Sequence, residues 1–388
     1  MKFFVGSVLA GCALAQTVAP AGTELPGTAV MPRLETQDII DGGTRKTIKH
    51  GPWVMPANKM TTKTVRGEPP CTSCYITAIQ AKISFLDGKE ANADQGAWLH
   101  HITLGKGLSM FWAAGNERPT LRLNRKHKYG LDLEGSTSAG GGFAGLGAGL
   151  TSAGGSGAAG GSGGLLSGQG SLFGKGRAAK RQLGLSSGLF IMADLMSMAA
   201  EDMQVTLDIT YEWVPKTNTE YKGAKMEWLT VGEPKAREGT YKFDSQKWTA
   251  PWSAELLYAI GHMHDGATHS SLFLDNKEIC RSIMYYNARD GYGGAAGEGH
   301  GHDMEGMDTG AAEHSHRRRD RIARADNAKR DGPSHLSDPG VCENFGAVRT
   351  GQKLRMEGWY DTAKNPLMGH NGELEDLMAN MRVYMGPT

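Results

Sequence analysis

The fold class is decided by a stretch of alternating side chains, MQVTLDITYEW, which spans residues 203–213. Apolar and polar residues take turns along it, and successive side chains of a β-strand point to opposite faces of the sheet. One face is therefore apolar from end to end. It carries Met203, Val205, Leu207, Ile209, Tyr211 and Trp213. This period of two predicts a β-strand with one face in a hydrophobic core.

The same alternation recurs elsewhere in the chain. It appears in YITAIQAKISF (residues 75–85), KLRMEGWY (353–360) and LMANMRVYM (377–385), and LFLDNKEIC (272–280) predicts a hairpin that turns on Asp275-Asn276. Long amphipathic helical patterns are scarce. Many strands with few helices are typical of two-layer packing, so we predict an all-β protein built from antiparallel β-sandwiches.

Length and composition bound the organisation of the chain. Its 388 residues, of which 39% are hydrophobic, provide material for two cores. We predict domains at residues 16–215 and 216–388. The formal net charge of +1 gives no overall field that would attract nucleic acid or acidic lipid. Beyond the N-terminal segment, no stretch reaches the roughly 18 apolar residues of a membrane-spanning helix.

Two segments interrupt the strand pattern. Residues 135–188 consist mainly of Gly, Ser and Ala, which cannot bury enough surface to offset the entropy of ordering. Residues 293–332 are rich in Gly and His and contain two His-x-His pairs, His300/His302 and His314/His316. We predict that both segments are disordered insertions, and the second could capture metal weakly, because a flexible loop loses entropy on binding.

The first residues, MKFFVGSVLAGCALAQ, have the pattern of a secretory signal peptide. A lysine precedes a short apolar run, and ALA at residues 13–15 is a suitable cleavage site. We therefore predict removal of residues 1–15 and a secreted protein. The LAGC stretch at residues 9–12 also resembles a bacterial lipoprotein acceptor, but the apolar run before it is unusually short for that role.

Four cysteines remain after the predicted cleavage, and an even number in a secreted chain indicates two disulfides with three possible pairings. We favour Cys71 with Cys74 and Cys280 with Cys342, because each bridge then stays inside one predicted domain. A zinc site formed by all four is the alternative, although the chain has a single CxxC pair.

Three places carry candidate metal ligands. His262 and His264 stand two residues apart on a predicted strand, so their imidazoles project from the same face. His100 and His101 are adjacent and would point to opposite faces, so joint ligation requires a bulge or the end of the strand. Met378 lies opposite the apolar face of its strand, which favours a role other than packing. Two imidazoles and a thioether would suit copper, since a thioether is a soft donor that Cu(I) accepts.

The order of these motifs resembles the copper type II, ascorbate-dependent monooxygenases of the peptidylglycine α-hydroxylating and dopamine β-monooxygenase kind. The stretches VTLDITYEWVP, HMHDGATHSSLFLDNKEIC and HLSDPGVC look closest to their stress-up-regulated nodulin-like relatives. The resemblance spans about residues 53–385 without the two insertions. It implies two tandem jelly-roll β-sandwich domains, copper as the cofactor and ascorbate as the reductant.

The resemblance also implies roles for the candidate ligands. His262, His264 and Met378 would match the copper site that binds dioxygen, and His100 and His101 would match two of the three histidines of a separate electron-transfer copper site. The family's third histidine falls in the strand at residues 203–213, which has none.

Two further positions depart from the family pattern, because Ile260 replaces a substrate-binding Arg and Arg382 replaces a substrate-binding Tyr. Asp265 and Asn380 are candidates for orienting the imidazoles.

Three functions remain open at this stage. The first is a secreted copper-dependent monooxygenase that hydroxylates an activated C–H of a small substrate with dioxygen. The second is a copper-binding protein for capture or delivery without turnover. The third is a metal-free β-sandwich with an interaction role in stress or in the cell wall. The sequence names neither the substrate nor the oligomeric state.

Overall fold

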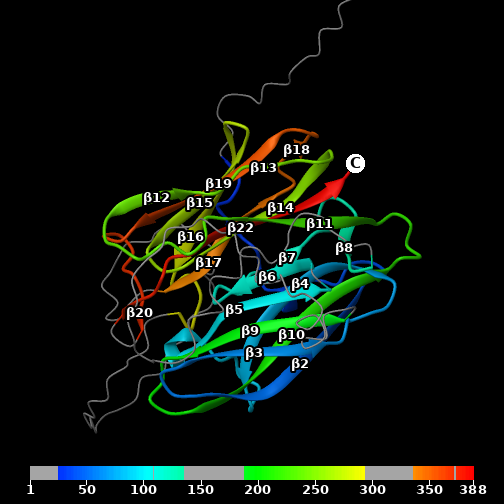
Figure 1. Ribbon diagram of the computed structural model, residues 1–388. Helices are drawn as coiled ribbons and strands as arrows, with labels where there is room; N and C mark the ends of the chain where they lie inside the picture. Colours follow the sequence, from blue (N-terminus) through cyan, green and yellow to red (C-terminus); the bar gives the residue numbers. More distant parts are fainter. Residues whose placement is uncertain (1–24, 108, 135–187, 293–334, 371–372) are drawn as a thin grey trace, which may run out of the picture.

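A computed structural model describes residues 25–107, 109–134, 188–292, 335–370 and 373–388 (Figure 1). Three predicted segments lie outside these residues: the signal peptide at residues 1–15, the insertion at 293–332, and the insertion at 135–188 apart from Gly188.

The described residues form strands almost throughout. The first half of the chain contains β1 (Ala29–Val30), β2 (Thr44–Met55), β3 (Met60–Gly67), β4 (Cys74–Phe85), β5 (Ala97–Lys106), β6 (Ser109–Gly115), β7 (Leu121–Arg122), β8 (Tyr129–Asp132), β9 (Leu189–Ser197) and β10 (Met203–Pro215). Two short 3-10 helices accompany them, η1 (Leu34–Thr36) and η2 (Ala93–Gln95).

The second half continues with strands alone among its described residues. It contains β11 (Lys222–Thr230), β12 (Thr240–Asp244), β13 (Trp248–Thr249), β14 (Ala254–Met263), β15 (Ala267–Leu274), β16 (Lys277–Tyr286), β17 (Leu336–Glu343), β18 (Ala347–Val348), β19 (Lys353–Asp361), β20 (Gly369–His370), β21 (Glu373–Leu374) and β22 (Ala379–Pro387). The predicted all-β, sandwich-like fold class is thus confirmed.

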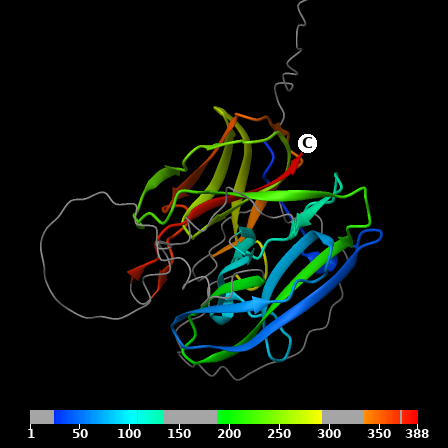
Figure 2. The same ribbon diagram turned by 45° about the vertical axis from the view of Figure 1, so that its right-hand side comes forward.

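Two layers enclose the core of the first half. A sheet in the order β3-β9-β5-β6 packs against the strands β8-β4-β10-β2 (Figure 2). The second layer continues through β11 and β22 into the strands of the second half, ending at β12. The two halves therefore share one hydrogen-bonded sheet as well as a packed interface.

The strand predictions agree with the register and the burial. Strand β10 is hydrogen-bonded to β2 and β4 at its two edges, and on its apolar face Val205, Leu207, Ile209 and Tyr211 are fully buried in the core. The hairpin of β15 and β16 turns on Asp275-Asn276, with Asp275 in the left-handed region. Aspartate and asparagine tolerate this conformation better than most residues, which explains their place in the turn.

Strand β22 is buried on both faces. Met381 and Val383 belong to the core of the second half, whereas Tyr384 joins the core of the first half. Arg382 lies on the same side as Tyr384 and donates a hydrogen bond to the backbone carbonyl of Ala113. One strand thus connects the two cores, and its polar residues face the seam between them.

The favoured disulfides are both present: Cys71 is bonded to Cys74, and Cys280 to Cys342. The second bridge joins β16 to β17 inside the core of the second half. This pairing leaves none of the four thiols for zinc. The division at residue 215 stays a prediction.

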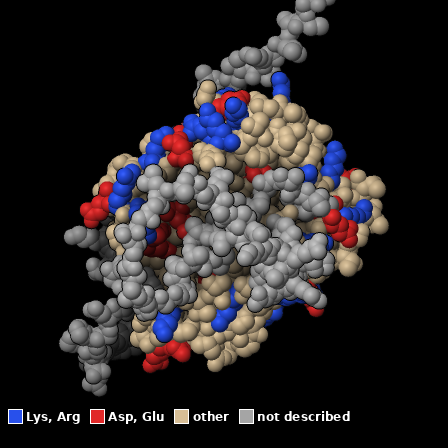
Figure 3. All heavy atoms as spheres, viewed as in Figure 1, with Lys and Arg blue, Asp and Glu red and all other residues tan. Residues whose placement is uncertain are grey.

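Within the described residues, no helix has the length and apolar character to cross a membrane. On the face shown in Figure 3, basic and acidic side chains lie close to one another rather than in separate regions.

Candidate metal centre

The adjacent histidines of β5 sit on a β-bulge. The pairing of β5 with β9 shifts register between Leu99 and His101, which leaves His100 as the extra residue. A bulge interrupts the alternation of side chains and lets neighbouring residues point the same way. The ring centroids of His100 and His101 lie 4.0 Å apart, so the condition for joint ligation is met.

The other two histidines come from the end of β14. His262 pairs with Asn380 of β22, and His264 follows directly after the strand. Both rings turn toward the seam between the halves, with centroids 5.6 Å apart. This matches the prediction that residues two apart on a strand share a face.

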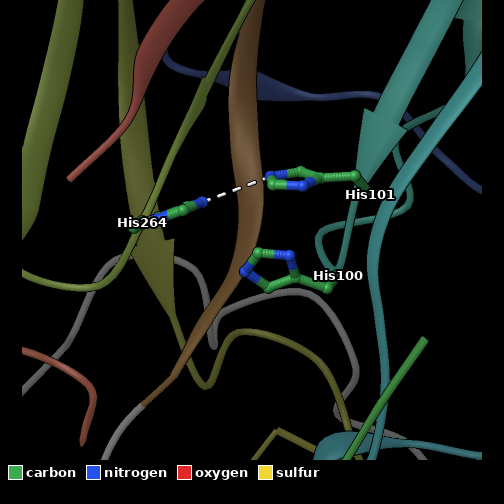
Figure 4. A group of neighbouring side chains, drawn as sticks. All are labelled: His100, His101 and His264. Atoms are coloured by element: carbon green, nitrogen blue, oxygen red, sulfur yellow. Dashed lines mark hydrogen bonds between the residues drawn. The ribbon is translucent and has the colours of Figure 1, made fainter. Parts of the chain in front are cut away.

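The two pairs of histidines meet across the seam. His264 approaches His101 from the opposite side, and their Nε2 atoms lie 3.3 Å apart (Figure 4). Ligand atoms of His100, His101 and His264 all lie within 4.8 Å of one another. The ring of His262 lies 5.1 Å from that of His101, so a fourth imidazole borders the group.

Each histidine has one nitrogen within hydrogen-bond or ion-pair distance of an oxygen. His262 Nδ1 contacts both carboxylate oxygens of Glu117, at 3.1 and 3.0 Å, and His264 Nδ1 donates to the Asp376 carbonyl at 2.7 Å. A carbonyl only accepts, so the proton of a neutral His264 lies on Nδ1 and its Nε2 carries a lone pair. Similarly, the Glu117 carboxylate holds the proton on Nδ1 of His262.

The pair on β5 follows the same rule. His100 Nε2 is hydrogen-bonded to Glu375, and His101 Nδ1 lies 3.6 Å from an Asp194 carboxylate oxygen. The opposite nitrogens, Nδ1 of His100 and Nε2 of His262, are buried without a hydrogen-bond partner among the described residues. Metal-binding histidines characteristically donate their second N–H to a carboxylate or carbonyl, which fixes the ring and the tautomer.

The spacing of the inner nitrogens suits one ion. Two nitrogens bound to the same ion at about 2.0–2.1 Å with tetrahedral angles lie about 3.3 Å apart. The Nε2 atoms of His101 and His264 have this separation. The structure places these two nitrogens at hydrogen-bond distance, and a cation between them would replace the N–H···N contact with two metal–nitrogen bonds. The donor set therefore fits a metal ion that prefers imidazole.

The surroundings of His101 and His264 keep their imidazoles free to bind a metal ion. Burial, followed by the neighbouring His100, lowers the pKa of His101 to about 3. Burial also lowers the pKa of His264. For His100, burial would lower the pKa, but the Glu375 carboxylate outweighs it and raises the pKa. His101 and His264 are therefore neutral at physiological pH and can bind metal without first losing a proton.

A tight turn after β6 positions the carboxylate behind His262. The Arg118 N–H donates to the Gly115 carbonyl at 3.0 Å, and the Gly115 N–H donates to Glu117 at 3.2 Å. A Cβ on Gly115 would lie 2.3 Å from Cε1 of His262, so only glycine lets the imidazole approach this turn. The local sequence Gly-Asn-Glu-Arg thereby places Glu117 directly against the His262 ring.

Arg382 completes this arrangement. It is 1% exposed, donates to the Gly261 carbonyl at 3.2 Å, and lies 3.4 Å from Glu117. Burial would raise the pKa of the Glu117 carboxyl, but His262 and Arg382 outweigh burial and hold that pKa well below its usual range. The copper monooxygenases that the sequence resembles have tyrosine at this position. The arginine found here therefore stabilises the charged form of the Glu117 carboxylate.

A cavity of about 30 Å³ opens beside the histidines. Its lining includes Trp98, His100, Asn116, Glu117, His262, Met263, His264, Asp265, Leu336, Met368 and Glu375. A water molecule needs about 10–15 Å³ by the same kind of measure, so the space admits only a few small atoms.

The structure differs from the two separate copper sites that the resemblance implied. It brings His100 and His101 against His264, because the first half of β5 meets the end of β14 at the seam. The backbone carbonyl of Met378 accepts from the His264 N–H at 3.3 Å. The described side chains lining the cavity include Met263 and Met368 but not Met378, so the Met378 thioether ligand stays a prediction.

The groups that orient the imidazoles differ from those predicted. Asp265 accepts from His335 Nδ1 at 2.7 Å and from the Leu336 N–H at 2.9 Å, not from a histidine of the group. The amide atoms of Asn380 have no hydrogen-bond partner among the described residues. The orienting carboxylates are Glu117, Asp194 and Glu375, which sequence reasoning missed. Neither spacing nor alternation connects them to the histidines, and the only local signal was the Gly-Asn-Glu-Arg turn.

Replacing Glu117 with glutamine is expected to lower the affinity for a divalent ion about 10- to 100-fold. Glutamine can still accept from His262 Nδ1 but removes the charge that strengthens the imidazole as a donor. Competition against a chelator of known affinity measures the change. Glu220→Gln is the control, because that carboxylate is exposed and pairs with Lys128 instead. Equal affinities for the two variants would show that Glu117 has no part in binding.

Taken together, these residues form a cluster of histidines that could hold a metal ion, at the seam of a β-sandwich protein. The chain is similar to the "Probable copper-dependent oxygenase M1" of Phoma sp., with 23% identity over 329 residues that cover 82% of this chain and 65% of the relative. It thus spans somewhat less than two thirds of that relative's length. It is also similar to the "Probable copper-dependent oxygenase clz3" of Cochliobolus lunatus, with 22% identity over 318 residues, 79% of this chain and 78% of the relative.

No family model matches the chain. Among solved structures it is similar to a peptide-N(4)-(N-acetyl-β-D-glucosaminyl)asparagine amidase, with 9% identity, a TM-score of 0.33, and coverage of 89% of this chain and 97% of the other. A TM-score this low supports no conclusion about shared fold or function. The sequence relatives support a relationship to copper oxygenases.

Proposed function

We propose that this protein is a copper-dependent oxygenase whose ion is held by His100, His101 and His264, with His262 as a fourth imidazole. The observation that carries the proposal is the convergence of four imidazoles, each with one nitrogen in contact with an oxygen. Imidazole suits both oxidation states of copper, which an oxygenase has to use. The names of the two relatives support copper over other imidazole-binding metals.

Copper bound here would supply the activation of dioxygen for oxygen insertion into a substrate C–H bond. The protein's own residues would do the remaining work. Glu117, Glu375 and the Asp376 carbonyl hold the rings in one orientation, which avoids reorganisation when the ion changes its charge. The small cavity beside the histidines would restrict the access of water to a bound ion. We retain secretion, ascorbate as the electron donor, and Met378 as an additional ligand as parts of the proposal.

Copper titration of the metal-free protein tests the proposal. The His-rich segment could bind copper by itself, so the informative protein carries alanine at His300, His302, His314 and His316. We expect this variant to retain one tightly bound copper per chain, with nitrogen couplings in the electron paramagnetic resonance spectrum. A variant that holds no copper would contradict the proposal and leave a metal-free sandwich with an interaction role.

Oxygen uptake driven by ascorbate distinguishes an oxygenase from a copper-capture protein. The copper-loaded protein is expected to consume dioxygen faster than the same amount of copper bound to a histidine-containing peptide. The His101→Ala variant serves as the inactive control. Tight copper binding without any oxygen uptake would assign the protein to copper capture or delivery instead.

A further inference from the structure

Two residues that line the cavity carry polar atoms with no hydrogen-bond partner among the described residues. Nε1 of Trp98 and both amide atoms of Asn116 are buried and unpartnered among the described residues. Trp98 is 5% exposed and Asn116 is 8% exposed. Both side chains line the cavity that His100, His262 and His264 also line. A buried polar group without a partner lowers stability by about 1–3 kcal/mol, so such groups in one small cavity indicate a ligand.

Both side chains are held in place by their surroundings. Trp98 stands on β5, two residues before His100, and its ring packs edge-on against His335 with centroids 4.5 Å apart. Asn116 belongs to the turn that positions Glu117, and its backbone carbonyl accepts a hydrogen bond from the Tyr292 hydroxyl. The same elements that place the histidines therefore place these two side chains. A rigid donor beside a metal ion is preorganised for a ligand of that ion.

The remaining lining residues restrict the charge of such a ligand. The cavity is lined by three carboxylates, Glu117, Glu375 and Asp265. The Asp265 oxygens are occupied by His335 and the Leu336 N–H, and Glu117 is occupied by His262. These three carboxylates disfavour an anionic ligand in the cavity. A cationic ligand beside the metal ion is disfavoured too, because the indole N–H of Trp98 can only donate a hydrogen bond. The ligand is therefore neutral, and it accepts a hydrogen bond from Trp98.

We propose that Trp98 and Asn116 form a hydrogen-bonding subsite for a small neutral oxygen ligand on the open side of the metal ion. The inference rests on the copper site proposed above and adds the residues that hold what the ion binds. The volume of about 30 Å³ admits a diatomic molecule, water or a hydroxyl group, and excludes the body of an organic substrate. Asn116 can both donate and accept, so it can serve a hydroxyl as well as a diatomic molecule.

Carbon monoxide bound to the reduced copper protein is the probe. Its stretching frequency falls when a donor points at its oxygen, because the donor strengthens electron transfer from the metal into the C–O antibonding orbital. Trp98→Phe keeps an aromatic ring and removes the N–H, and Asn116→Leu keeps the volume and removes both polar atoms. We expect a higher C–O frequency in each variant than in the parent protein, and the largest increase in the double variant. Trp252→Phe, remote from this cavity and packed against Trp248, is the control and should leave the frequency unchanged.

The outcomes separate this inference from the copper proposal. Copper content is measured in every variant, and carbon monoxide affinity should fall about three- to tenfold for each lost hydrogen bond. Full copper loading with an unchanged frequency in both variants would overturn the subsite and leave the copper site standing. Weaker azide binding without any carbon monoxide shift would show that the subsite takes an anion, which also overturns the inference. A parent protein without copper would overturn both. Because Trp98 and Asn116 lie on different elements, either variant decides the matter if the other fails to fold.

Discussion

Replacing His264 with alanine is expected to abolish tight copper binding, with a loss of affinity of more than about 100-fold. Removal of a group that only orients a ligand lowers metal affinity about 10- to 100-fold, and His264 is a candidate ligand itself. It is also the second-half histidine whose Nε2 lies 3.3 Å from Nε2 of His101. Chelator competition on the variant without the four His-rich segment histidines measures the loss.

Two measurements keep this prediction specific. His127→Ala removes a partly exposed histidine that lies near Glu255 and does not line the cavity, and it should leave copper affinity unchanged. The thermal unfolding temperature of the metal-free His264→Ala protein should stay close to that of the metal-free parent. Unchanged copper affinity in His264→Ala would mean that the ion binds elsewhere.

Replacing Arg382 with leucine is expected to destabilise the protein by about 3–5 kcal/mol. The guanidinium is buried and satisfies the carbonyls of Ala113 and Gly261 as well as the charge of Glu117. Removing one partner of a buried ion pair leaves the other charge without compensation. Urea unfolding of the metal-free protein measures the difference in the free energy of unfolding.

A second substitution separates the charge from the packing. Glu117→Gln in the Arg382→Leu background removes the uncompensated carboxylate, so the double variant should recover part of the lost stability. Arg281→Leu is the matched control, since that arginine pairs with Glu278 near the surface and should change stability by less than about 1 kcal/mol. A loss of less than about 1 kcal/mol for Arg382→Leu would show that the buried Arg382–Glu117 pair contributes little to stability.

The strands could be predicted because alternation is a local property of the sequence. Strand β10 and the hairpin of β15 and β16 follow from period two and from Asp275-Asn276 alone. Strand β22 shows where this reasoning ends. Its apolar face was evident, but the burial of Arg382 on the opposite face depends on the first half of the protein. A charged residue on a predicted strand reads as solvent-facing unless its distant partner is known.

The four histidines of the candidate centre could be predicted from the sequence, but the way they lie against one another could not. His262 and His264 follow from their spacing, and the need for a bulge at His100 and His101 follows from adjacency. The meeting of the two pairs depends on how β5 and β14 approach each other across the seam. The orienting carboxylates lie far from their histidines in the sequence. Glu375 and His100, for example, are 275 residues apart.

The shared seam has a consequence for the behaviour of the whole molecule. An ion that requires ligands from both β5 and β14 binds only while the two halves are docked, so its binding free energy adds to the free energy of docking. Because the halves also share a hydrogen-bonded sheet and β22 enters both cores, loss of the metal would lower the stability of the seam without separating the halves. The metal-free protein would therefore be cleaved by proteases faster than the metal-bound protein, and cleavage would begin in segments at the seam.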